Sequence, residues 1–461
     1  MNEFAESNPT WIDRWDPEDG AFWSAQGRAI AKRNLVWSIV AENLGFSIWL
    51  LWSVVATKLS SAGFHYSTEE LFNLVALPGL VGSLLRFPYA LAVPKFGGRN
   101  WTIVSAFLLF VPVLSLAFLV SRPDTPYWLM ALAAASAGAG GGNFASSMAN
   151  ISFFYPDREK GFALGLNAAG GNIGVSTVQL VVPLVVGWGW VNLGAVDARG
   201  GVYLANAGLM WVPFLAIAIV GASRYMNNLS SARSNMRDQL AITSSKHTWI
   251  MAWLYIGTFG SFIGYSAAFP LLLKAQFPCH SANLAFLGPF VGSVARPLGG
   301  KLADAKGGTR ITLLSFCAMA AATLGVIHFV DARDFAGFLA VFFLLFVISG
   351  VGNGSTFRMI PVIFRNEKLS SLAGASASAK EEAIQAARIE SATVLGFVSA
   401  VGACGGYLVP RSFGASIHAT GSVHAALVGF LVFYATCVGL TWTFYVRRPA
   451  GAPAWRSEVP V

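Results

Sequence analysis

Long apolar runs alternate with short polar segments along the whole chain. Each run has about 20 residues or more, the length that an α-helix needs to cross a lipid bilayer. There are twelve such runs, at residues 34–57, 70–94, 101–120, 127–155, 162–187, 203–225, 248–275, 282–303, 310–330, 335–364, 390–410 and 424–446. The pattern therefore predicts an all-α integral membrane protein with twelve transmembrane helices.

The chain also repeats itself at a distance of 210 residues. This shift aligns Val81–Arg86 with Val291–Arg296, and it aligns the pairs Gly97–Gly98 and Gly142–Asn143 with Gly307–Gly308 and Gly352–Asn353. The repeat predicts two pseudo-symmetric six-helix halves. The expected domains are a tail at 1–33, the first half at 34–226, a polar linker at 227–246, the second half at 247–446 and a tail at 447–461. Two parallel halves of this kind place a substrate site between them, near the middle of the membrane.

The composition fits a membrane protein. Of the 461 residues 55% are hydrophobic and 11% are charged, whereas an average soluble domain has about 25% charged residues. The excess of 31 Lys and Arg over 22 Asp and Glu raises the possibility of a nucleic-acid partner, but the cations lie in the loops. Twenty-three of them fall in the tails and in the loops on the same side, and six fall in the opposite loops. The positive-inside rule then places both termini in the cytoplasm, and we expect no nucleic-acid partner.

The amino-terminal tail combines tryptophans with basic residues. Trp11, Trp15 and Trp23 precede Arg28 and Lys32, and both residue types favour the membrane interface. We expect an interfacial segment on the cytoplasmic leaflet, the alternative being a flexible tail.

Two arginines, Arg86 and Arg296, lie inside apolar runs. A buried charge there is costly unless it is paired or faces a cavity, which makes it a candidate for function. Glu42 is the only acid deep in the predicted spans, so at least one arginine lacks a fixed counter-ion. The repeat puts one arginine on each half, and the guanidinium fork matches planar oxyanions. We therefore predict an anion site, the alternative being a structural ion pair with a carboxylate.

The surroundings of the arginines indicate a small substrate. The runs at 127–155, 162–187 and 390–410 are dense in glycine, which lets helices approach closely in lipid. Asn172 is polar within an apolar helix, where it could face the substrate or bond another helix. Phe46, Phe144, Tyr255 and Phe259 could line the site or belong to the core. No metal-ligand spacing and no catalytic motif occurs in the spans, so we expect no metal, no cofactor, no catalytic residue and no enzyme.

Several motifs in order resemble one known family. They are Leu84–Tyr89, Gly142–Phe154, Gly165–Gly174 and Thr258–Gly264. The chain is similar, from about Trp15 to the last span, to the bacterial nitrate/nitrite porters, the NarK-like branch of the major facilitators. It departs from the family's first glycine signature at Ile173, where a methionine is usual.

The resemblance implies roles for particular residues. Arg86 and Arg296 would clamp the anion, and Phe144 would stack on it, with Phe46, Tyr255 and Phe259 completing the box. Asn172, Gly396 and Ser399 would line the site or act as hinges. The substrates would be nitrate and nitrite, carried by alternating access through the bacterial inner membrane. Because each chain contains both halves, we expect a monomer in the lipid bilayer.

The mode of coupling stays open at the level of the sequence. In this family, exchange of nitrate for nitrite goes with a core without protonatable groups, and symport with protons needs one. Glu42 precedes Phe46 by four residues and shares its helix face, so nitrate/proton symport through Glu42 is the alternative to exchange. An anion channel and an organic-phosphate exchanger are further alternatives, which counterflow and phosphate competition would separate.

Overall fold

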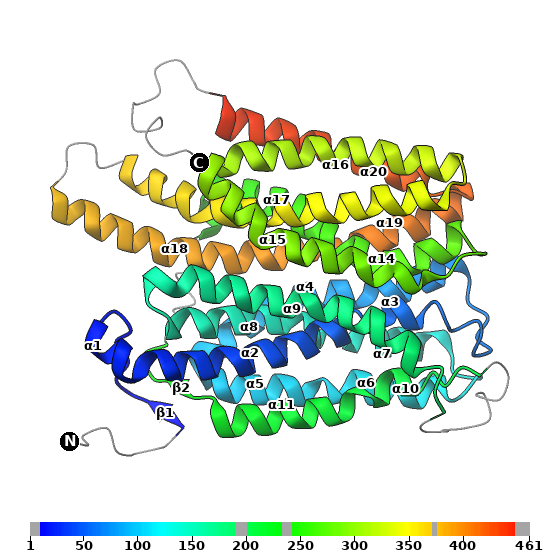
Figure 1. Ribbon diagram of the computed structural model, residues 1–461, viewed down its shortest axis with the longest axis horizontal. Coiled ribbons are helices and arrows are strands. Elements are labelled where there is room, and N and C mark those ends of the chain that lie inside the picture. The colour runs from blue at the N-terminus through cyan, green and yellow to red at the C-terminus, as the bar shows by residue number, and fades with distance from the viewer. Residues whose placement is uncertain (1–9, 190–200, 233–241, 371–375, 448–461) are drawn as a thin grey trace. The chain divides into compact units, whose positions relative to one another are not determined.

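A computed structural model describes residues 10–189, 201–232, 242–370 and 376–447 (Figure 1). The described residues are nearly all helical, apart from two short strands, β1 (Trp11–Ile12) and β2 (Asn228–Leu229), which pair in parallel. The predicted all-α membrane fold is confirmed. The chain forms two compact units: unit 1 contains residues 1–65 and 81–235, and unit 2 contains residues 66–80 and 236–461.

Unit 1 holds the helices of the first part of the chain and the second part of α4 (Thr68–Phe96). Its other helices are α1 (Gly20–Phe22), the π-helix η1 (Trp23–Gly27), α2 (Arg28–Trp49), α3 (Leu51–Val55), α5 (Gly98–Leu108), α6 (Phe110–Val120), α7 (Tyr127–Ser136), α8 (Ala139–Phe154), α9 (Asp157–Val185), α10 (Asn206–Leu209) and α11 (Trp211–Tyr225).

Unit 2 holds the first turns of α4 and the remaining helices. These are η3 (Ile242–Ser244), α13 (Lys246–Tyr255), the π-helix η4 (Ile256–Gly260), α14 (Ser261–Gln276), η5 (Ala282–Phe286), α15 (Leu287–Lys306), α16 (Gly308–Asp331), α17 (Phe335–Ser370), α18 (Ala377–Ala403), α19 (Gly405–Thr420), α20 (His424–Thr441) and the π-helix η6 (Trp442–Val446).

Each of the twelve predicted apolar runs coincides with one helix or with two or three successive helices. Among the described residues, ten continuous helical stretches are long and apolar enough to cross a membrane. The other two runs correspond to α7 with α8 and to η5 with α15. A turn at Ala137–Gly138 interrupts the first. In the second run, α15 carries Arg296 at its middle and Lys301, Asp304 and Lys306 in its second half, and these charges lower its hydropathy.

The backbone shows the 210-residue repeat at two glycines. Gly97 has φ +85° and precedes α5, and Gly307 has φ +87° and precedes α16. A residue with a side chain rarely adopts a positive φ, so both positions favour glycine. The two positions correspond under the shift, so the same local turn begins a helix in each half of the sequence.

The amino-terminal segment packs on unit 1. Trp23 is 2% exposed and lies in a hydrophobic cluster with residues of α8, α9 and the start of the linker. Its Nε1 donates to Oε1 of Glu159 at 3.0 Å, and Arg28 forms an ion pair with the same oxygen at 2.9 Å. Trp23 is therefore buried against other helices of unit 1, and the interfacial position of the amino-terminal segment stays a prediction.

Candidate functional site

Three charged side chains are buried among the described residues. They are Glu42 and Arg86, each 1% exposed, and Arg296, 7% exposed. Glu42 and Arg86 belong to unit 1 and Arg296 belongs to unit 2. These are the three charged residues that the sequence placed deep in the apolar runs, so each unit contains one buried guanidinium.

Arg86 lies on α4 among aromatic rings of unit 1. Its Nε donates to the carbonyl oxygen of Gly141 at 3.0 Å. Its Cζ lies 4.6 Å from the centroid of the Phe144 ring and 5.3 Å from that of Trp49. Phe144 in turn meets Phe46 edge to face, with ring centroids 6.1 Å apart. The structure thus brings together three of the predicted residues, and a guanidinium over aromatic faces is stabilised by cation–π attraction.

Trp49 is a member of this cluster that the sequence analysis missed. Its indole fits against two glycines: a Cβ on Gly82 would lie 2.6 Å from its Nε1, and a Cβ on Gly141 would lie 2.7 Å from its Cε2. Trp49 is 1% exposed. It follows Phe46 by three residues and therefore shares its helix face, which was the available signal.

Asn172 lies on α9 and is fully buried, with 0% exposure. Neither its Oδ1 nor its Nδ2 forms a hydrogen bond with any described residue. Leaving a buried amide without a partner costs about 1–3 kcal/mol. The side chain therefore carries donors that suit an oxyanion.

Arg296 lies on α15 in a second aromatic cluster, in unit 2. Its Nη2 donates to the Tyr255 hydroxyl at 3.3 Å, and its Cζ lies 5.4 Å from the centroid of the Phe357 ring. Tyr255 stacks on Phe259 with centroids 5.4 Å apart. Phe259 belongs to η4, a π-helical turn, and such turns are frequent at functional sites. The predicted residues Arg296, Tyr255 and Phe259 therefore lie together.

Phe357 on α17 is the second residue that the sequence analysis missed. The Phe357 ring makes a cation–π contact with Arg296, as the Phe144 ring does with Arg86. The 210-residue shift maps Phe144 onto Gly354, three positions away, so the repeat did not indicate Phe357.

Gly396 and Ser399 lie on α18 of unit 2. Ser399 is 2% exposed, and its hydroxyl donates to the carbonyl oxygen of Gly396 at 2.8 Å. A Cβ on Gly396 would meet nothing within 4 Å. Close helix packing therefore does not explain the glycine at position 396. The role of Gly396 and Ser399 in the site stays a prediction.

Glu42 accepts hydrogen bonds from neutral side chains of two neighbouring helices. Ser147 on α8 donates its hydroxyl to Oε2, and Asn167 on α9 donates from Nδ2 to the same oxygen at 2.7 Å. The Ser147 hydroxyl also lies 2.9 Å from that of Ser38. Glu42 thus belongs to a buried polar cluster between α2, α8 and α9.

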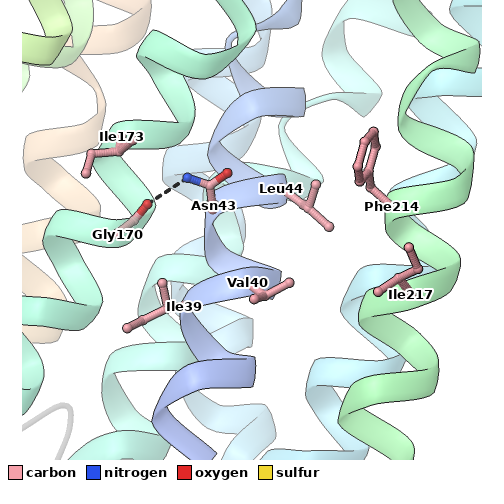
Figure 2. Close-up of a pocket in the computed structure, with 8 residues that line it drawn as sticks. All are labelled: Ile39, Val40, Asn43, Leu44, Gly170, Ile173, Phe214 and Ile217. Atoms are coloured by element: carbon pink, nitrogen blue, oxygen red, sulfur yellow. Dashed lines mark hydrogen bonds between the residues drawn. The ribbon is translucent and has the colours of Figure 1, made fainter.

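A surface pocket of about 430 Å³ lies elsewhere in unit 1 (Figure 2). It is lined by Ile39, Val40, Asn43, Leu44, Gly170, Ile173, Phe214 and Ile217. The lining is apolar except for Asn43, whose Nδ2 donates to the Gly170 carbonyl oxygen at 2.9 Å. It contains none of the predicted site residues, and it lacks the cationic donors that an anion needs.

Comparison with known proteins identifies the family. A family model described as the Major Facilitator Superfamily matches residues 40–381. The chain is 45% identical over 457 residues to the nitrate/nitrite transporter NarU of Escherichia coli K12, with 96% of this chain and 98% of that relative covered. This chain belongs to the nitrate/nitrite porters of the major facilitator superfamily. The porter is also 36% identical over 461 residues to the probable nitrate/nitrite antiporter NarK2 of Thermus thermophilus, covering 96% and 98% of the two chains.

Solved structures support the fold of the porter. A bacterial homolog of the human lysosomal transporter Spinster, in an inward-facing and occupied conformation, aligns with a TM-score of 0.59 at 14% identity, covering 90% of this chain and 98% of the other. The nucleoside transporter NupG aligns with a TM-score of 0.58 at 10% identity, covering 90% and 99%. The match to the superfamily and the identity to NarU show that the porter is a multi-pass membrane transporter and not an enzyme.

Proposed function

We propose that this porter carries nitrate and nitrite across the bacterial inner membrane by alternating access, exchanging one anion for the other. The names of NarU and NarK2 support the substrates, and the name of NarK2 supports the exchange. The observation that carries the proposal is a buried guanidinium in each unit, covered by aromatic rings.

The proposed anion site joins the two arginine clusters. Arg86 and Arg296 bind the oxygens of one planar anion, because the guanidinium fork matches such an ion and stays charged when it is buried. The Phe144 ring stacks on the anion, with Phe46, Tyr255 and Phe259 completing the box. Asn172 donates from its amide. Gly396 and Ser399 line the site or serve as a hinge.

The permanent charge of the arginines favours exchange. An empty carrier would have to move two buried guanidinium groups through its cycle with no anion bound, and a charge within the membrane is costly. A bound anion on both the outward and the return steps avoids that cost. Nitrite leaving in exchange for nitrate entering fulfils this condition.

Nitrate/proton symport is the second candidate. It is favoured by one observation: Glu42 is the only fully buried acid among the described residues. Uptake of a proton by Glu42 would not neutralise the arginines, so symport needs a further rearrangement.

We further propose a monomer with both termini in the cytoplasm. The excess of Lys and Arg in the tails and in the loops on their side supports this orientation. The expected domain boundaries, at 34–226 and 247–446 around the linker at 227–246, belong to the same proposal.

Counterflow in proteoliposomes tests the proposed exchange. Labelled nitrate is added outside vesicles that are empty or loaded with nitrite, with and without an inward proton gradient. Exchange predicts saturable uptake only into the nitrite-loaded vesicles, unaffected by the gradient. Gradient-driven uptake into empty vesicles would establish symport instead, and non-saturable flux would indicate a channel. Vesicles without protein and competition by phosphate serve as controls.

A further inference from the structure

Three helices that carry proposed site residues meet at Glu42. Glu42 belongs to α2, and its carboxylate accepts hydrogen bonds from Ser147 of α8 and from Asn167 of α9. Glu42 is 1% exposed, Ser147 is 9% exposed and Asn167 is 0% exposed. Both donors are neutral and both bind the same oxygen, Oε2. We call Glu42, Ser147 and Asn167 the polar junction.

Gly171 of α9 leaves the space that the other carboxylate oxygen occupies. A side chain on Gly171 would collide with Oε1 of Glu42, and its Cβ would lie 2.8 Å from the carboxylate carbon Cδ. One turn further along, the Ser47 hydroxyl donates to the carbonyl oxygen of Gly174 at 2.9 Å. On the pocket side of the same helix pair, Asn43 donates to Gly170, as Figure 2 shows. Helix α2 is therefore fixed in a glycine groove of α9 by several hydrogen bonds.

The polar junction lies one helical turn from the aromatic rings near Arg86. Phe46 follows Glu42 by four residues on α2, and Ser147 follows Phe144 by three residues on α8. Residues at these spacings share a helix face. The two rings meet edge to face with centroids 6.1 Å apart, and Phe144 covers the guanidinium of Arg86. A change in how α2 and α8 meet at the junction would therefore move these rings.

We propose that Ser147 and Asn167 are positioning residues, which hold Glu42 as a fixed acceptor and thereby set the positions of Phe46 and Phe144 in the nitrate site. In this role Glu42 joins three helices and carries no proton through the transport cycle. The inference rests on the proposed binding of nitrate at Arg86, and it adds residues that the anion does not touch.

The required property of Glu42 is then its acceptor oxygen and not its ability to bind a proton. Glutamine retains one carbonyl oxygen, which has two lone pairs and can accept from both donors. Alanine retains none, so Ser147 and Asn167 lose the acceptor that joins them to α2 at position 42 and keep the contacts of Ser147 with Ser38 and Asn167. This loss costs stability and lets the helices shift. Glu42→Gln and Glu42→Ala therefore separate the two roles.

Nitrate binding to the purified porter in detergent tests this inference, because binding requires no particular mode of coupling. We expect Glu42→Gln to keep the Kd for nitrate within about threefold of the wild-type value. Glu42→Ala, Ser147→Ala and Asn167→Ala should each weaken it by roughly tenfold, because the displaced rings of Phe46 and Phe144 no longer fit the anion. Ser115→Ala is the matched control, because this hydroxyl bonds only the Pro112 carbonyl of its own helix among the contacts described.

Kinetics of exchange in vesicles add a second readout. The alanine variants should raise KM more than they lower the maximal rate, and Glu42→Gln should leave the pH profile of exchange unchanged. An unchanged Kd in Ser147→Ala and Asn167→Ala would overturn the inference, as would a Glu42→Gln variant that is as impaired as Glu42→Ala. Absence of nitrate binding by the wild-type porter would instead overturn the proposed function. Thermal unfolding of every variant identifies any that does not fold.

Discussion

At the scale of single residues, the notable feature is that both buried arginines lie against aromatic faces. Arg86 has Phe144 and Trp49, and Arg296 has Phe357 and the hydroxyl of Tyr255. An aromatic face attracts the cation without neutralising it, whereas a carboxylate would compete with the anion for the same donors. These rings therefore stabilise a buried charge, which in the proposed site binds the anion.

Removing the ring of Phe357 tests this reasoning. A desolvated cation–π contact is worth about 2 kcal/mol or more, and an exposed one about 0.5–1 kcal/mol. We expect Phe357→Ala to weaken nitrate binding by roughly tenfold or more. Phe118→Ala is the matched control, because Phe118 is 53% exposed and lies 4.3 Å from Cζ of Arg122 in a contact of the same kind. Equal effects of the two variants on the Kd would contradict the role of Phe357.

At the scale of helices, glycines of α9 form a groove in which α2 packs. Gly171 and Gly174 both lie where a Cβ would overlap α2: the first would strike the Glu42 carboxylate, and the second would lie 3.1 Å from Cβ of Phe46. These contacts lie within unit 1. The glycines therefore build the internal packing of this unit, with the proposed site residues on the helices that they bring together.

Two alanine substitutions on α9 separate packing from helix propensity. Gly171→Ala forces Glu42 or α2 to move, so we expect a lower unfolding temperature and weaker nitrate binding. In Gly165→Ala the added Cβ meets nothing within 4 Å. Alanine is favoured over glycine by about 1 kcal/mol in a helix interior, so that variant should be as stable as the wild type or more so. Thermal unfolding in detergent measures both. A Gly171→Ala variant that behaves like Gly165→Ala would contradict the proposed groove.

The helices could be predicted from the sequence because an apolar run in lipid must satisfy its backbone hydrogen bonds internally. The burial of three charges could be predicted from the same runs, because Glu42, Arg86 and Arg296 lie within them. The missed features depend on which helix faces meet. Trp49 and Phe357 join the arginine clusters through contacts between helices distant in sequence, and the docking of Trp23 against Glu159 links positions 136 residues apart. Periodicity within one segment places Trp49 on the helix face of Phe46, but it does not indicate which other helix that face contacts.

At the scale of the whole molecule, the duplicated sequence underlies the proposed mechanism. Each half of the chain supplies one arginine at corresponding positions, Arg86 and Arg296, and one glycine with positive φ, Gly97 and Gly307. In the proposed mechanism, each half contributes one incomplete half-site. The central claim is that a single anion requires both arginines, so that loss of either one removes the whole site.

The stoichiometry of nitrate binding tests this claim most directly. Isothermal titration of the purified porter is compared with Arg86→Ala, Arg296→Ala and the matched control Arg122→Ala, which replaces a loop arginine. If one anion requires both arginines, the wild type and the control bind one nitrate per chain, and the other two variants show no measurable binding. Two nitrates per chain, or a single-arginine variant that binds nitrate with wild-type affinity, would contradict it.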